Sequence, residues 1–282
     1  MPRLVLLCAL LACSFAASAA KMSDMAGIQI ESSLHVTGTI DIGPSGDVIA
    51  HTLDQPQKLP KGIIDMAARI VPQWKFEPVA LQGVKISRSN MNLLFIGKKL
   101  DNGDFSIDLR SATFSGGNPD ELAGLDAKQR RLPKYPDQLL GAGISGTVFV
   151  MVKIGRDGKV IAAEASHVNL RVIGSESEMD LWRSTLARNS IAAIKRWTFI
   201  APKTGPEAEK AYWMGTLPVD YLIGGQKIPA YGTWQTYVAG PKALIPWQDD
   251  TFKPGVNPDA LTPNTFHPAG VGRQLLTPLP GG

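Results

Sequence analysis

Cysteine is almost absent from this 282-residue sequence, which contains only two. Both, Cys8 and Cys13, lie near the N-terminus, so the rest of the chain has no thiol. That absence excludes disulfides and cysteine-based metal sites from residue 14 onward. Histidine is also scarce, with four residues, and none of them forms an i, i+4 pair or an H-E-x-x-H motif. The common zinc-hydrolase signature is therefore excluded.

Long apolar runs and a strong net charge are missing as well. The run at residues 4–12 is shorter than the roughly 20 residues of a membrane-spanning helix. It follows Arg3 and precedes small residues at 17–20, which predicts a cleaved signal peptide over residues 1–20 and an exported chain without a membrane anchor. Residues 10–13 also resemble a lipobox, so a lipoprotein anchored through Cys13 is the alternative. A net charge of only +4, without a basic stripe, argues against nucleic acid as a partner.

What the sequence does contain is one stretch in two copies. Each copy has a helical spacing of positions i, i+4, i+7, i+8 and i+11 that ends on a tryptophan, followed two residues later by a phenylalanine. These positions are Ile63, Ala67, Ile70, Val71 and Trp74 in the first copy and Leu186, Ser190, Ala193, Ile194 and Trp197 in the second. The spacing predicts an amphipathic helix that runs into an extended Trp-x-Phe segment, with both tryptophans in the core.

A hairpin pattern also occurs twice. Residues 42–50 and 154–162 share Ile-Gly-x-x-Gly followed by Val-Ile-Ala, with alternating strand patterns on either side. We therefore predict an α+β fold with two tandem strand–strand–helix–strand units, at residues 28–115 and 132–228. The first unit has an added hairpin at 99–115, and residues 116–131 form a linker. Residues 229–282 are rich in proline and are predicted to be an extended, mostly irregular tail.

No group of residues predicts catalysis, a metal site or a cofactor. Residues 141–146 match G-x-G-x-x-G, but here a helix precedes the motif and a strand follows it, the reverse of a dinucleotide site. Asp101 and Asp104 are turn formers with too few oxygen ligands nearby for calcium. His35 and His51 could meet across the first hairpin, but they have no third ligand. Ser145 is not in a G-x-S-x-G elbow.

The second unit resembles the C-terminal domain of the TonB energy-transducer family over residues 132–224. The motifs that carry the resemblance are Tyr135-Pro136, Gly146-Thr147-Val148-x-Val150, Asp157-Gly158-x-Val160, Ala192-Ala193-x-x-Arg196-Trp197-x-Phe199-x-x-Pro202 and Leu217-Pro218-Val219. Residues 34–96 look like a diverged copy, which lacks the Tyr-Pro start and has Pro72 near the end of its helix. The resemblance implies a domain in the periplasm of a Gram-negative bacterium.

The resemblance also implies a function and a site. It implies a non-enzymatic module that takes the plug-side peptide of an outer-membrane receptor by strand addition at its last strand. The residues implied for this contact are Tyr135, Arg196, Met214, Thr216, Leu217, Val219 and Tyr221. Without an anchor and a Pro-rich spacer before its domains, the chain is expected to bind a protein or peptide, or else to be an accessory component of energy transduction. The tail could instead fold back over this edge, and Pro218 would leave a gap in one ladder.

Overall fold

The structure is a computed structural model that describes residues 28–78, 86–100, 102, 104–115, 132–201, 206–223, 229–248, 257–270 and 272–279. The predicted signal peptide, Cys13 and the predicted linker lie outside the described residues, as does Asp101. Within the described part of the chain, no helix is long and apolar enough to cross a membrane.

The first unit is a four-stranded antiparallel sheet covered by one helix. Its elements are β1 (Ile30–Ile42), β2 (Val48–Leu53), η1 (Pro56–Lys58), α2 (Lys61–Ile70), η2 (Val71–Gln73), β3 (Ser87–Lys99) and β4 (Phe105–Ser115). Strand β1 pairs with both β2 and β3, and β4 pairs with the far side of β3. The regular helix α2 ends at Ile70, and the backbone continues as the short 3₁₀ segment η2. Pro72 favours this ending because it has no N–H to donate to a helical carbonyl.

The second unit has the same order of strands and helix. Its elements are α3 (Asp137–Leu140), β5 (Gly146–Gly155), β6 (Val160–Leu170), α4 (Glu176–Ile194), η3 (Pro206–Glu209) and β7 (Tyr212–Tyr221). Strand β5 pairs with β6 and β7, as β1 pairs with β2 and β3. Helix α4 begins with a capping box, in which Ser175 and Glu178 each bond the other's backbone N–H.

The shared Ile-Gly-x-x-Gly turn has a structural reason that is the same in both units. Gly46 and Gly158 have φ angles of 86° and 80°, which favour glycine. Phe76 donates its N–H to the Gly46 carbonyl, and Phe199 donates to the Gly158 carbonyl, both at 2.8 Å. A Cβ on Gly46 or Gly158 would lie 2.0 or 2.1 Å from a phenylalanine carbonyl oxygen. The turn glycine therefore lets the Trp-x-Phe segment close onto the hairpin.

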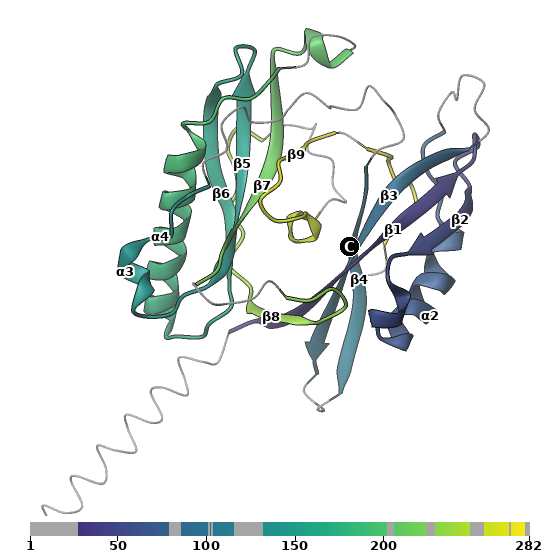
Figure 1. Cartoon of the computed structure of the whole chain (residues 1–282), viewed down its shortest axis with the longest axis horizontal. Coiled ribbons are helices and arrows are strands. Elements are labelled where there is room, and N and C mark those ends of the chain that lie inside the picture. The colour runs from purple at the N-terminus through teal and green to yellow at the C-terminus, as the bar shows by residue number, and fades with distance from the viewer. Residues whose placement is uncertain are drawn as a thin grey trace, which may run out of the picture.

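Each unit has its own core between helix and sheet. Trp74 and Phe76 are buried in the first core, and Trp197 and Phe199 are buried in the second. The prediction that both tryptophans are core residues is confirmed. Figure 1 shows α2 and α4 on opposite outer sides of the molecule, with part of the C-terminal segment between the two units.

The C-terminal segment is more ordered than the predicted irregular tail. It contains β8 (Gln235–Val238), η4 (Pro258–Ala260) and β9 (His267–Pro268). Strand β8 pairs with the start of β1 and touches β6 at Leu170, which joins both units in one sheet of order β4-β3-β1-β8-β6-β5-β7-β9, with β2 on β1. Four residues of β8 are too few to show a period, so the sequence did not reveal this strand.

The end of the described chain returns to the first unit. Leu276 donates its N–H to the Lys75 carbonyl at 2.8 Å, and Glu77 donates to the Gln274 carbonyl at 3.0 Å. Leu275 and Leu279 pack on the first core. The segment from residue 229 onward therefore contacts both units and ties them together.

His35 and His51, which could have met across the first hairpin, are not paired there. In the ladder of β1, His51 lies opposite Ile40, whereas His35 lies opposite Leu94 of the other neighbouring strand, β3. The ladder between β1 and β2 begins at Gly38, so His35 precedes the part of β1 that β2 pairs with.

Candidate functional site at the edge of strand β7

The far edge of β7 is the edge that the sequence singled out, and the chain's own C-terminal segment lies along it. We call residues 264–269 the strap. Gly215 and Thr216 of β7 form a ladder with Pro268 and His267 of the strap. The alternative in which the tail folds back over this edge is thus the arrangement in the structure.

Backbone hydrogen bonds hold the strap at both of its ends. Ala269 donates its N–H to the Met214 carbonyl at 2.8 Å, and Asn264 donates to the Pro218 carbonyl at 2.6 Å. The side-chain oxygen of Asn264 also accepts the N–H of Asp220 at 3.2 Å. The backbone groups of residues 214, 218 and 220 therefore point toward the strap.

Phe266 anchors the strap in the second core. Its ring lies over Gly215, where a Cβ would meet the ring at 2.3 Å and the His267 carbonyl at 2.5 Å. The ring also contacts Phe199, with ring centroids 5.0 Å apart. Because Gly215 has no side chain, the strand leaves room for this ring, and the strap fits closely onto it.

Proline at position 218 limits what the edge can offer. Its carbonyl faces the strap, and in an antiparallel ladder the N–H of the same residue would face the same side. Proline has no N–H, so any strand that adds here lacks one donor at this position. The edge can accept at residue 218 but cannot donate.

Five of the seven residues implied for the partner contact lie on β7. Leu217, Val219 and Tyr221 are buried in the second core. Met214 and Thr216 alternate with them and are buried too. These five side chains are therefore covered, and what β7 presents at its edge is backbone.

Tyr135 and Arg196 lie away from the strap. Tyr135 packs edge-on against Tyr221, with ring centroids 6.2 Å apart. The hydroxyl of Tyr221 bonds Asn189 at 2.9 Å and Ser190 at 2.8 Å on α4. Burial raises the pKa of Tyr221, although these two bonds act in the opposite direction. Tyr221 therefore holds β7 on α4, while Arg196 is exposed just after the helix ends.

His267 is the titratable residue of the strap. Its Nε2–H donates to the Thr262 carbonyl at 2.9 Å. Burial lowers the pKa of His267, and the bond to Thr262 offsets part of that effect. Asn264, Phe266 and His267 were not singled out in the sequence, where they stand in a proline-rich stretch without a period.

The described residues contain no cluster of three or more His, Cys, Asp or Glu side chains that could hold a metal ion. Residues 141–145 lie between α3 and β5, and Gly146 begins β5, so the motif follows a helix and precedes a strand as the sequence predicted. No helix follows the motif directly, so no helix N-terminus is available there for a phosphate.

Residues 131–223 match the family model described as Gram-negative bacterial TonB protein C-terminal. This part of the chain is TonB C-terminal-like. The match spans α3 to β7 and confirms the resemblance seen in the motifs. No curated protein and no solved structure matches the chain. The TonB C-terminal domain is a non-enzymatic protein-interaction domain of envelope proteins, and here its last strand is β7.

Proposed function

We propose that the chain is a periplasmic, non-enzymatic module that binds a protein or peptide by strand addition at the far edge of β7. The observation that supports this best is the short cover on the edge of the TonB C-terminal-like unit. The strap pairs with β7 at two positions, whereas the corresponding edge of β3 pairs with β4 at ten. A short cover can be replaced by a longer strand.

In this proposal an extended peptide takes the place of residues 264–269. Backbone N–H and C=O groups of residues 214–220 give the affinity, and the peptide's alternate side chains give the specificity. Leu217, Val219 and Tyr221 act indirectly, because their burial under α4 keeps β7 in position. Arg196 is the exposed cation of the predicted set, and because it lies away from the strap it would favour an acidic peptide through long-range attraction rather than contact.

The family of the second unit supports the choice of peptide. Its relatives in the TonB family bind outer-membrane receptors, so a peptide from the plug side of such a receptor is the first ligand to test. We further propose that residues 28–115 are a diverged copy of the unit at 132–228, that residues 116–131 link them, and that residues 1–20 direct export. The shared pairing of the strands and the shared glycine turn support the tandem arrangement.

Substituting the strap's anchor tests this function. Phe266→Ala removes the ring that packs on Phe199 and Gly215, which weakens the strap without touching the β7 backbone. Every 1.4 kcal/mol lost by the strap tightens peptide binding by about tenfold. Titration of a fluorescent receptor-plug peptide against the full mature chain should therefore show tighter binding by the variant.

The matched control is Phe105→Ala, which removes a phenylalanine that is 71% exposed on β4, in the other unit. It should leave the peptide affinity unchanged. Equal or weaker binding by Phe266→Ala, measured on a folded variant, would show that the strap does not compete with the peptide. The proposed function would then be wrong.

A further inference from the structure

A cavity of about 310 Å³ lies between the two units, on the sheet faces opposite the helices. Its lining on the first unit comes from one face of β1, where Ser33, His35 and Thr37 alternate with the buried core residues Leu34 and Val36. In sequence this polar face looks like a solvated strand face. In the structure the second unit faces it and encloses it.

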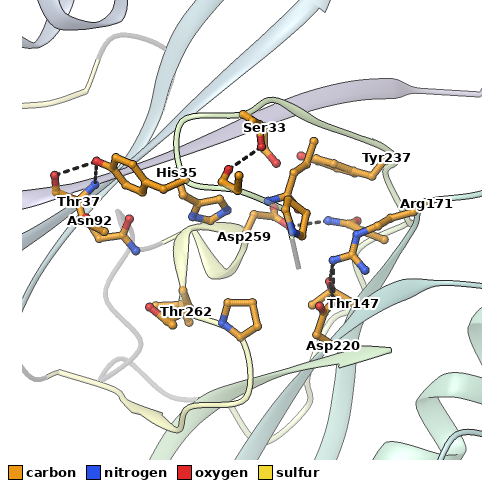
Figure 2. Close-up of a pocket in the computed structure, with 18 of the residues that line it drawn as sticks. Ser33, His35, Thr37, Asn92, Thr147, Arg171, Asp220, Tyr237, Asp259 and Thr262 are labelled. Atoms are coloured by element: carbon orange, nitrogen blue, oxygen red, sulfur yellow. Dashed lines mark hydrogen bonds and ion pairs between the residues drawn. The ribbon is translucent and has the colours of Figure 1, made fainter. Parts of the chain in front are cut away.

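The second unit and the C-terminal segment supply the rest of the wall. Figure 2 shows His35 beside Asp259, with Arg171, Thr147 and Asp220 grouped together on another side of the cavity. Ser33, Thr147 and Asn169 of the lining are buried, and the rim is exposed at Ala230, Thr233, Thr262 and Pro263. The cavity is therefore open to a small molecule from the rim.

Two carboxylates are held in fixed positions in this wall. Oδ1 of Asp259 accepts from Asn169 at 2.7 Å and lies 3.0 Å from Nε2 of His167. Oδ1 of Asp220 accepts from Arg171 at 2.6 Å and from Thr147 at 2.8 Å. Among the residues that the structure describes, neither Oδ2 atom has a partner. Each carboxylate thus keeps one oriented acceptor for a ligand.

The cavity is lined by charged groups of both signs. Arg171 pairs with Asp220. Burial alone would raise the pKa of Asp259, but the bond and charge of His167, the charge of Lys242 and the Asn169 amide together lower it. Burial lowers the pKa of His35, which favours the neutral imidazole. Arg171 and the carboxylates of Asp220 and Asp259 all line the cavity, so a ligand of either charge would meet a group of its own sign. A neutral polar ligand avoids that repulsion and fits better.

Aromatic rings provide the apolar part of the wall. Phe149, Tyr231 and Tyr237 line the cavity, and aromatic side chains of this kind pack favourably against C–H groups. The hydroxyls of Tyr231 and Tyr237 already bond Thr37 and Glu31, which holds both rings in place. An apolar wall with a few oriented polar groups is the usual composition of a small-molecule site.

From these features we propose that the cavity binds a neutral, polyhydroxylated ligand of the sugar class. A hydroxyl group donates and accepts at once, so one ligand hydroxyl can donate to Oδ2 of Asp259 while it accepts from a neighbouring donor. The apolar face of a sugar ring would lie on the tyrosine rings. The cavity is at the small end of the range for ligand sites, roughly 300–1,000 Å³, which matches one or two sugar rings better than a peptide.

Saturation-transfer NMR and calorimetry on the full mature chain test this site with glucose, N-acetylglucosamine and maltose as neutral probes. Glucosamine and glucuronate serve as the cationic and anionic comparisons. At least one neutral sugar should bind more tightly than both charged ones. Asp259→Asn keeps the acceptor toward His167 and Asn169 but turns the free acceptor into a donor, so it should weaken neutral-sugar binding by about tenfold or more.

Asp65→Asn, at an exposed carboxylate on α2, is the matched control and should leave sugar binding unchanged. Thr262→Val, at the exposed rim, is a second variant that spares the buried network and should also weaken binding. No neutral sugar bound up to about 10 mM, unaltered binding by folded Asp259→Asn and Thr262→Val, or binding of a charged sugar alone would each overturn the proposal. None of these results depends on peptide binding at β7.

Discussion

At the scale of single residues, the two turn glycines explain why the same short motif occurs twice. Gly46 and Gly158 each stand where a Trp-x-Phe segment returns to its hairpin, and each has a positive φ. The sequence showed the repeated motif but not its reason. The reason is a contact between the turn and a phenylalanine carbonyl about 30 to 40 residues later, which no local pattern reveals.

We predict that Gly158→Ala destabilises the protein by more than about 1 kcal/mol, because its Cβ would lie 2.1 Å from the Phe199 carbonyl oxygen and its φ is unfavourable for alanine. Gly141→Ala is the control, since a Cβ there meets nothing within 4 Å and φ is −67°. Urea unfolding of both variants gives the comparison. If both variants unfolded at the same urea concentration, the contact with Phe199 would not matter.

At the scale of elements, the sequence predicted what has a period and missed what does not. The two hairpin turns and the helices before Trp74 and Trp197 lie where their patterns predicted them, because turn residues and a helical spacing mark them. Strand β8 was missed, since its partners at the start of β1 are far away in the sequence. The strap was foreseen only as a tail that could fold back over the edge of β7, and Phe266 was not recognised as its anchor.

The strap should loosen as the pH falls. Burial gives His267 a lowered pKa when the strap is attached, while detached it titrates near 6.5. As the pH falls below about 6.5, His267 binds a proton in the detached form but not in the attached form. The free energy that favours attachment therefore decreases until the pH reaches the lowered pKa. Hydrogen exchange at the amides of Asn264 and Ala269 should show falling protection between pH 7 and the lowered pKa.

The variant His267→Gln keeps a donor for the Thr262 carbonyl but has no titrating ring. Its strap protection should change less with pH than that of the wild type, after correction for intrinsic exchange rates. A pH dependence as steep as in the wild type would assign the effect to another group.

At the scale of the whole molecule, the C-terminal segment turns two small units into one structure. It adds β8 between β1 and β6, crosses the cavity at Asp259, covers β7 and ends on the first unit at Lys75. The sequence predicted the tryptophan of each hydrophobic core, because each lies at the end of its own helical pattern. It could not predict the cavity, since two polar strand faces look alike whether they face water or each other.

The central claim is that a partner peptide and the strap compete for the edge of β7. Residues 216 and 267 lie opposite one another in the ladder, so Thr216→Cys/His267→Cys places two thiols at the spacing of a cross-strand disulfide. The chain has no cysteine beyond Cys13, so the described residues contain no other thiol. Oxidation of the pair would fix the strap on β7, and reduction would release it.

The most direct measurement is the affinity of a labelled receptor-plug peptide for this double variant before and after reduction, with each single cysteine variant as the control. The account predicts saturable binding by the reduced form, loss of binding by the oxidised form, and no effect of oxidation in the single variants. Equal binding by the oxidised and reduced forms would contradict it, because the peptide would then occupy a surface other than the edge of β7.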